Sequence, residues 1–515
     1  MGTHREIEVK LEVSPDVTLP DLAGLPGVTT VKRQEGVLLE AVYFDTGDLR
    51  LARAQITLRR RTGGPDAGWH LKLPVSTHER IEVQASLGPA EAAVPAELTS
   101  AVAARARTAP LEPVVVLRTQ RTVHTLHDRS GRVLAEVADD AVTSHSPGAG
   151  DDVVDAWREW EVELVEGDRG LLATTVHVLQ EAGGTVSGWS SKLARALDWR
   201  LSAAGAAHDV TAGTDDAVPA GTGSAGSVLA AHLRGQRDEL LAYDSRVRRD
   251  EPDAVHKMRV ATRQLRSVLA TFRPLLRDQA GETLREELRW LAQILGAARD
   301  AEVARDRLVV LVEAEQAELV VGPVGSRLEA DRAGAYRAAY REVLTVLDSS
   351  RYFELLDALD ALVDHPPLAE SAARGAEEVL PARVRHEWDG LARAFRAARK
   401  SPAGPVHDVH LHETRKAAKR ARYAAEAVSP ALGHPAEGFA SAAKDLQTLL
   451  SDHHDCVELR KVLRRVCAQA EAAGESGFTY GRLHALEQAR ADHLEAQLPA
   501  AWKRISSGKR QRWLG

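Results

Sequence analysis

Two segments of this 515-residue sequence place a histidine and three cations on one face of a predicted helix. The first segment is HKMRVATRQLR, residues 256–266, and the second is HETRKAAKRAR, residues 412–422. In each segment these four residues are spaced i, i+3, i+7 and i+10, so they fall within an arc of about 80° on a helix. Apolar residues lie roughly opposite in the first segment, which is typical of an amphipathic helix. Such a ridge of cations predicts contact with an anion.

A solvent-exposed helix face is the alternative explanation for a single ridge. Exposed faces usually mix both signs of charge, because opposite charges four residues apart stabilise a helix. The first segment has no acid, and the second has only Glu413, which lies off the ridge. Two ridges with the same spacing therefore favour a groove for a polyanion. A phosphate chain fits better than nucleic acid, since only Tyr423 is available to stack on bases.

The two ridges belong to an internal repeat. RWLAQILGAARDAEVAR, residues 289–305, aligns with KDLQTLLSDHHDCVELR, residues 444–460, at an offset of 155, and the ridges lie 156 positions apart. Nearly equal offsets indicate a duplication. We expect two helical bundles related by a pseudo-two-fold axis, in repeats at about 228–365 and 380–505. The residues predicted to bind polyphosphate are His256, Arg259, Arg263, Arg266, Arg289, His412, Arg415, Lys416, Lys419, Arg422 and Lys444.

The histidines of these segments have a second interpretation as metal ligands. His256 and His412 could bind a metal together with His453 and His454. Carboxylates and cysteines at ligand spacing are missing from the segments, so the anion groove is the better hypothesis. A histidine beside several cations is expected to stay neutral or to bind an anion.

Charged residues also alternate with apolar residues in the first 200 positions. In EIEVK, the side chains of Glu6, Glu8 and Lys10 share one face of a predicted strand, and Ile7 and Val9 share the other. The same alternation places further pairs and rows on shared faces, namely Arg59 with Arg61, His70 with Lys72, Arg80 with Glu82, Glu136 with Asp140, and Glu159 with Glu161 and Glu163. Facing outward, these charges form the wet surface of a filled barrel. Facing inward, they line a charged tunnel.

An inward arrangement would need a cation among its acids. Adjacent carboxylates raise each other's pKa unless a positive charge lies between them. We expect a divalent ion held by Glu6, Glu8, Glu161 and Glu163. Seven cations would then face a polyanion, namely Lys10, Arg59, Arg61, Lys72, Arg80, Arg121 and Lys192.

The elements that must position these residues differ between the two halves of the chain. Up to about residue 200 the apolar pattern has period two, which predicts about eight strands in an antiparallel barrel or sandwich, with helices at 98–107 and 170–182. Residues 201–227 are rich in Gly, Ala, Ser and Thr and are predicted to form a flexible linker. Beyond them the period is 3.6, which predicts an all-helical half.

Composition limits the classes of protein that fit. A net charge of −7 argues against a general nucleic-acid coat, and 44% hydrophobic residues are ordinary for a globular protein. Cys456 and Cys467 are the only cysteines, which fits a reducing compartment. No run approaches the ~18 apolar residues of a membrane span, and the N-terminus lacks a signal peptide. We expect a cytoplasmic protein.

The helical half resembles the CHAD domain, the conserved-histidine helical domain. The resemblance rests on the two ridges and on LGAARD and LSDHHD, which follow them, and it covers about residues 228–505. Ser451 replaces Gly296 in the second copy, which is a small departure. The resemblance implies a tandem of four-helix bundles that binds inorganic polyphosphate, and an association with polyphosphate granules.

The strand half resembles the CYTH family of triphosphate tunnel metalloenzymes over about residues 3–200. The ExExK motif opens it, and YFDT, LRRR, HLKL, RIE, EWEVEL and SSKLARAL follow in order. Many family members have Lys-x-Arg on a middle strand where this chain has Thr119 before Arg121. Arg118 would point outward, so one substrate cation is expected to be missing.

The CYTH resemblance implies an eight-stranded tunnel that hydrolyses triphosphates with Mg²⁺ or Mn²⁺. Glu8, Glu161 and Glu163 are the catalytic candidates, of which one not used by the metal would position the water. The implied triphosphate-binding residues are Lys10, Arg59, Arg61, Lys72, Arg80, Glu82, Arg121, Glu136, Asp140 and Lys192. Two alternatives are a non-catalytic polyphosphate-binding protein, favoured by Thr119, and an enzyme that acts on ATP or thiamine triphosphate.

Overall fold

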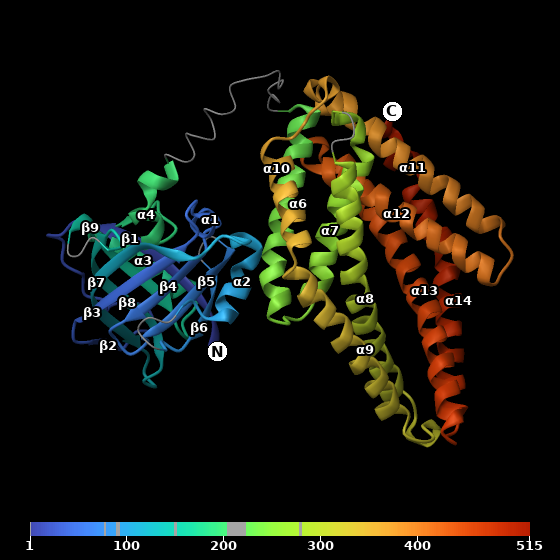
Figure 1. Cartoon of the computed structure of the whole chain (residues 1–515), viewed down its shortest axis with the longest axis horizontal. Coiled ribbons are helices and arrows are strands. Elements are labelled where there is room, and N and C mark those ends of the chain that lie inside the picture. Colours follow the sequence, from blue (N-terminus) through green and yellow to red (C-terminus); the bar gives the residue numbers. More distant parts are fainter. Residues whose placement is uncertain (1, 77–78, 89–92, 149–151, 203–222, 278–280) are drawn as a thin grey trace. The chain divides into compact units, whose positions relative to one another are not determined.

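The structure is a computed structural model that describes residues 2–76, 79–88, 93–148, 152–202, 223–277 and 281–515. The chain divides into two compact units, Met1–Asp215 and Asp216–Gly515 (Figure 1). The linker predicted at 201–227 lies mostly outside the described residues. Its predicted end is already helical, because helix α6 begins at Ala225.

Eight antiparallel strands close into a barrel in the first unit. Around the ring the order is β1-β6-β5-β4-β3-β7-β8-β9, and β9 pairs with β1 to complete it. Two short strands, β2 and β10, pair with β7 and β1 outside the ring. The strands are β1 (Gly2–Val13), β2 (Thr30–Arg33), β3 (Val37–Asp45), β4 (Thr57–Thr62), β5 (Gly68–Ser76), β6 (Glu79–Ala85), β7 (Glu112–His127), β8 (Val133–His145), β9 (Val153–Leu164) and β10 (Thr185–Val186). The predicted antiparallel barrel is confirmed.

The core of this unit lies mainly outside the ring of strands. Helix α3 (Arg169–Glu181) covers an apolar cluster that includes Leu11 and Trp160, both with fully buried side chains. Helix α2 (Ala96–Ala106) covers a second cluster on β4, β5 and β6. The helices predicted at 98–107 and 170–182 are therefore confirmed. Because the apolar faces of these strands pack under the helices, their charged faces point into the barrel.

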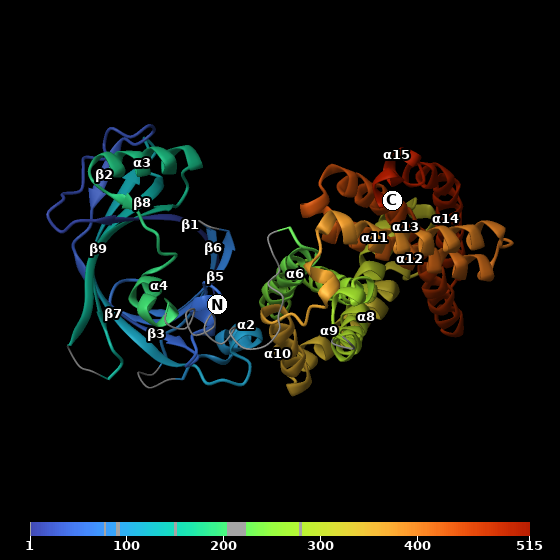
Figure 2. The same ribbon diagram turned by 90° about the horizontal axis from the view of Figure 1, so that it is seen from above.

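Helix α4 (Lys192–Ala196) lies over an opening of the barrel (Figure 2). Its first turn is capped by Ser191, whose side chain accepts a hydrogen bond from the Ala194 backbone N–H. Leu193 packs with Tyr43 and Leu117 from the strands, which anchors the helix. This anchoring directs Lys192 into the barrel, where its side chain is buried.

The second unit is all-helical, and its helix order repeats. Helices α6 to α10 form the first repeat and α11 to α14 the second, and α7 contacts α12. The helices are α6 (Ala225–Arg248), α7 (Ala254–Thr271), α8 (Glu282–Glu313), α9 (Val324–Leu347), α10 (Ser350–Asp364), α11 (Ala376–Lys400), α12 (Pro405–Leu432), α13 (His434–Ala472), α14 (Phe478–Ile505) and α15 (Gly508–Gln511). In the described part of the chain, no helix has both the length and the apolar character needed to cross a membrane.

The two repeats match in detail as well as in order. Arg259 on α7 lies against Gly296 on α8, where an added Cβ would be 3.5 Å from its guanidinium. At the equivalent place Arg415 on α12 donates a hydrogen bond of 3.0 Å to the Ser451 hydroxyl on α13. The departure at Ser451 thus keeps the arginine in place. The tips of the α8–α9 and α13–α14 hairpins share one apolar cluster, which joins the repeats at their far ends.

Asp45, at the end of β3, fixes the short helix α1 (Arg50–Arg53) to the barrel. Its fully buried carboxylate accepts hydrogen bonds from the backbone N–H groups of Thr46, Leu51 and Ala52 at 2.7, 2.9 and 2.8 Å. The YFDT motif therefore serves the fold as well as the tunnel.

We expect Asp45→Ala to lower the free energy of unfolding of the first unit by about 3 kcal/mol, because it leaves three N–H donors unpaired. Urea unfolding followed by tryptophan fluorescence measures the change. Asp16→Ala removes an exposed carboxyl and is the control. Equal stability of the two variants would contradict the anchoring role.

Candidate active site and anion pocket

A cavity inside the barrel is lined by the charged faces of the strands. All seven cations predicted to face a polyanion lie on its wall, namely Lys10, Arg59, Arg61, Lys72, Arg80, Arg121 and Lys192. The acids on the wall are Glu6, Glu8, Asp66, Glu82, Glu161 and Glu163. The interpretation of these charges as an outer wet surface is therefore wrong. Whether the cations bind a triphosphate stays a prediction.

One side of the cavity is a fully paired cluster around Lys192. Its ammonium lies 2.9 Å from Asp140, 2.7 Å from Glu159 and 2.7 Å from Glu161. Arg121 also pairs with Asp140 and Glu161. Burial alone would lower the pKa of Lys192, but these carboxylates outweigh it and raise the pKa above the ordinary value. The negative charge on this side is thus neutralised by the protein itself.

The balance of acidic and basic charges is different where β1 pairs with β9. Glu8 on β1 and Glu163 on β9 are direct cross-strand partners, and Glu6 lies two residues before Glu8 on β1. Burial would raise the pKa of Glu8, but Lys10, 2.5 Å away, and Lys72 lower it to about 2. Burial, together with the charges of Glu6 and Glu8, raises the pKa of Glu163 to about 7. In this acidic wall, made of Glu6, Glu8 and Glu163, lysines pair with the first two carboxylates, and Glu163 has no ion pair among the described residues.

The acidic wall holds three of the four carboxylates predicted to bind a divalent ion. Glu6 Oε2 is buried and lies 2.7 Å from Lys72 Nζ. Carboxylate oxygens are the ligands that Mg²⁺ and Mn²⁺ prefer. Glu6, Glu8 and Glu163 would hold such an ion.

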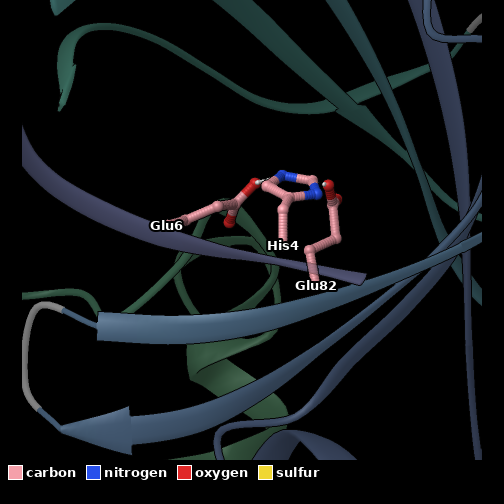
Figure 3. Close-up of side chains that lie close together, drawn as sticks. All are labelled: His4, Glu6 and Glu82. Carbon is pink, nitrogen blue, oxygen red and sulfur yellow. Dashed lines mark ion pairs between the residues drawn. The ribbon is translucent and has the colours of Figure 1, made fainter. Parts of the chain in front are cut away.

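The predicted metal quartet of Glu6, Glu8, Glu161 and Glu163 stays a prediction. Among the described residues, the groups with ligand atoms within 4.8 Å of one another are Asp140–Glu159–Glu161 and His4–Glu6–Glu82. Glu161 therefore belongs with the Lys192 cluster, because three cations surround it. In the second group His4 Nε2 lies 3.4 Å from Glu6 and 3.2 Å from Glu82 (Figure 3).

Three arginines supply hydrogen-bond donors to the cavity. Arg59 contacts only the Tyr43 hydroxyl, at 3.2 Å, and the Nε groups of Arg59 and Arg61 are buried without partners in the described part of the chain. Arg61 forms an ion pair with Asp66 from the β4–β5 turn. Arg80 lies 3.8 Å from Glu8 and donates to two backbone carbonyls. Unpartnered buried donors indicate a site that an anion completes.

Sequence reasoning missed Asp66 and Tyr43 as cavity residues, and the predicted role of Glu136, the cross-strand partner of Glu163, stays a prediction. Asp66 lies in a turn, outside the strand alternation on which the prediction depended. Glu136 is not among the residues that line the cavity. Thr119 does line the cavity, and Arg118, which forms an ion pair with Glu40 at 2.9 Å, is not among the lining residues. The missing substrate cation stays a prediction.

A second charged pocket lies in the helical unit, between α7, α8 and α12. Its wall carries seven cations, namely Arg263, Arg266, Arg285, Arg289, Lys416, Lys419 and Arg420, together with Ser267, Ala270 and Tyr423. No acid belongs to this wall. Arg263 and Arg266 of the first ridge and Lys419 of the second lie on this wall. Arg285 and Arg420 were not predicted, because each lies just outside the repeated pattern.

Several cations of this pocket have no acidic partner in the described part of the chain. Arg285 pairs with both carboxylate oxygens of Glu282, Lys416 pairs with Glu413, and Arg420 pairs with Glu387 at 3.2 Å. Burial, together with the charges of Arg263 and Arg415, lowers the pKa of Lys419 to about 6. Burial likewise lowers the pKa of Arg263 to about 10. Like charges held together in this way favour an anion between them.

The remaining residues of the predicted polyphosphate set lie outside this pocket. They are His256, Arg259, His412, Arg415, Arg422 and Lys444. Arg259 pairs with Asp300 at 3.1 Å, and Arg422 with Glu426 at 2.6 Å. The ring of His412 lies 4.5 Å from that of His454. Binding by these residues stays a prediction.

The fold and cavity define the first unit as a charged β-tunnel, and the second as a repeated helical domain with a basic pocket. Family models match both units, with a CYTH domain at residues 4–195 and a CHAD domain at residues 231–464. The chain therefore belongs to the proteins that join a CYTH domain to a CHAD domain.

The whole-chain relatives have the same extent. An uncharacterised protein of Mycobacterium tuberculosis is 39% identical over 523 residues, which cover 99% of this chain and 98% of the relative. Among solved structures, PptA from Streptomyces chartreusis is similar over 54% of this chain and 99% of its own, with 25% identity and a TM-score of 0.46. The CHAD domain from the plant Ricinus communis matches 57% of this chain and 95% of its own, with 22% identity and a TM-score of 0.45.

The raised pKa of Glu163 predicts a pH-dependent stability. Its ordinary value is 4.5, and in the folded protein it is about 7. Between these values the unfolded chain binds fewer protons than the folded one, so the free energy of unfolding falls as pH rises through this window and stays lower above it.

We expect Glu163→Gln to raise the free energy of unfolding at pH 8 by up to about 3 kcal/mol and to change it little at pH 4. Urea unfolding in EDTA at both pH values tests this, with Glu166→Gln as an exposed control. A difference that is the same at both pH values would show that Glu163 ionises freely.

Proposed function

We propose that the β-tunnel hydrolyses inorganic triphosphate or short polyphosphate with Mg²⁺ or Mn²⁺, and that the basic pocket of the helical unit binds polyphosphate. The observation that carries the proposal is the division of charge inside one closed cavity. Arginine donors lie on one part of the wall and an acidic wall on another, so a metal and a phosphate chain can be held side by side.

The arginines would bind the phosphates. Arg59 and Arg61 present unpartnered Nε donors, and Arg80 lies near Glu8 at the edge of the acidic wall. Guanidinium groups match phosphate oxygens in pairs, and they stabilise the charge that develops in the transition state. The cavity aromatic is Tyr43 alone among the described wall residues, which favours an inorganic substrate over one with a base or a thiamine ring.

The acidic wall would hold the metal, which supplies neutralisation of the phosphate oxygens and orientation of the attack. Glu161 is a poor candidate to accept a proton. Burial would raise its pKa, but Lys10, Lys192 and Arg121 hold the pKa well below its ordinary range. Glu8, whose pKa is about 2, is a poor proton acceptor for the same reason, so Glu163 is the carboxylate of the acidic wall that would position the water, and Glu8 would bind the metal.

We expect Glu8→Gln to lower the rate of phosphate release from tripolyphosphate by at least about 100-fold, because it removes a carboxylate shared by the metal and Lys10. Malachite-green detection with Mg²⁺, with Mn²⁺ and with EDTA measures this. Glu12→Gln, on the same strand, is the control, since Glu12 pairs with Arg195 away from the cavity wall.

Unchanged turnover in Glu8→Gln would rule out the proposed site. Wild-type protein that binds tripolyphosphate but releases no phosphate would instead support a binding protein, the reading that Thr119 favours.

The two ridges, from which Arg263 and Lys419 line the helical pocket, make a separate prediction. We expect the joint reversal of Arg259, Arg263, Arg415 and Lys419 to Glu to abolish polyphosphate binding and to leave tripolyphosphate hydrolysis nearly unchanged. Binding in the wild type should weaken steeply with salt, because the contacts are ionic.

Fluorescence titration with long-chain polyphosphate, at two salt concentrations, measures this binding. The matched control reverses four exposed cations of the same unit, namely Arg234, Arg396, Arg399 and Lys400. If the fourfold Glu variant loses polyphosphate binding and tripolyphosphate hydrolysis equally, the two units share one site.

A further inference from the structure

The two repeats of the helical unit do not build equivalent pockets. The repeat offset of 156 pairs Arg263 with Lys419, Arg266 with Arg422 and Ala270 with Glu426 on helices α7 and α12. A pseudo-two-fold arrangement should therefore produce two pockets, one on each side of the α7–α12 contact. The side chains at the paired positions 270 and 426 differ in charge and in length.

The side that contains Ala270 is open. Ala270 lies on the pocket wall with Arg266, four residues earlier on α7, and with Arg420 from α12. Its methyl group offers no acceptor, so Arg266 has no acidic partner among the described residues. Burial lowers the pKa of Arg266, as do Arg289 and Arg285 across the pocket. Arg266 on this side is therefore available to an external anion.

The side that contains Glu426 is filled by the protein itself. Arg422, the repeat mate of Arg266, donates from Nε to Glu426 at 2.6 Å and from Nη1 to Gln447 at 3.2 Å. Gln264, the repeat mate of Arg420, donates to the same carboxylate at 3.3 Å. Glu426 thus contacts the mates of the residues that surround Ala270. Its carboxylate holds the position that an anion would take on the open side.

A third difference lies on the flanking helices. With the offset of 155, Arg289 on α8 corresponds to Lys444 on α13, and Arg285 corresponds to Ala440. Ala440 is buried in the core, and Lys444 is exposed. The filled side therefore has three cations fewer, because Ala440, Gln264 and Val260 correspond to Arg285, Arg420 and Lys416, and it has an acid in addition.

We propose that the helical unit binds a polyphosphate chain in one pocket only, around Ala270, and that Glu426 is an internal anion that closes the pseudo-equivalent pocket. This inference rests on the proposed polyphosphate binding and deepens it. A single pocket makes the site asymmetric. The polyphosphate chain would then lie on the α8 side and would not be held symmetrically across the repeat axis. Positions 270 and 426 then determine which side binds.

Two reciprocal substitutions test the inference in the full-length protein. Ala270→Glu places a carboxylate four residues after Arg266, as Glu426 follows Arg422, and should weaken polyphosphate binding at least about tenfold. Glu426→Ala frees Arg422 and should strengthen binding by a few fold, with a steeper salt dependence. The probe is long-chain polyphosphate in EDTA, so that hydrolysis does not interfere and the contribution of the tunnel is the same in every variant.

The controls carry the same changes of charge at exposed positions. Ala397→Glu matches the first variant and Glu437→Ala the second. The gain expected for Glu426→Ala cannot arise from misfolding, which protects the test if Ala270→Glu is unstable. Circular dichroism melting checks the fold of each variant.

The outcomes separate this inference from the proposed function. If the wild type binds polyphosphate and both variants match their controls, the one-sided pocket is overturned, and polyphosphate binding by the unit stands. If the wild type binds no polyphosphate, the proposed function of the helical unit and this inference fail together. A loss in Ala270→Glu with a gain in Glu426→Ala supports the inference.

Discussion

The cost of removing charged groups from water governs the whole structure. In the first unit the strands carry charges on one face and apolar side chains on the other, and both faces must be accommodated. Helices α2 and α3 cover the apolar faces outside the ring, which leaves the charged faces inside. A charge buried without a partner is unstable, so the interior depends on close pairing, as around Lys192 with Asp140, Glu159 and Glu161. The tunnel exists because these pairs compensate for the loss of water.

The helical unit meets the same constraint in a different way. Its basic pocket brings cations together without acids on the wall, and apolar packing must overcome their repulsion. Met258 and Leu265 on α7 and Ala418 and Ala421 on α12 are fully buried, so the opposite faces of both ridge helices are fixed in the core. Burial of apolar surface at roughly 25 cal/mol per Å² can hold such helices in place. The stability of this unit should therefore rise when an anion binds, since the anion removes a repulsion that packing now opposes.

Most of the fold follows from periodicity, and much of the site follows with it. The alternation in EIEVK determines that Glu6, Glu8 and Lys10 share a face, and the equal spacing of the two ridges determines the repeat. Alternation alone cannot decide which face points inward, because a filled barrel and a tunnel have the same pattern; the motif resemblance made that choice. Ion pairs between residues of different strands and turns could not be predicted from the sequence. The sequence contains no signal that Lys192 forms an ion pair with Glu161, nor that Asp66, in a turn, forms one with Arg61. Residues that lack a periodic context, such as Arg285, were missed for the same reason.

The two anion sites differ in what an incoming phosphate must displace. In the tunnel, Arg61 is already paired with Asp66, and Lys72 lies beside Glu6. A phosphate there exchanges one negative partner for another, so the gain depends on how well its shape fits the fixed donors. For the proposed hydrolysis this favours product release, because the carboxylates can return to their cations. In the helical pocket, Arg263, Arg266, Arg289 and Lys419 have no ion-paired acid to displace among the described residues, so attraction between opposite charges would dominate, and the length of a bound phosphate chain would matter more than its fine geometry. The paired interior suits turnover, and the unpaired pocket suits retention.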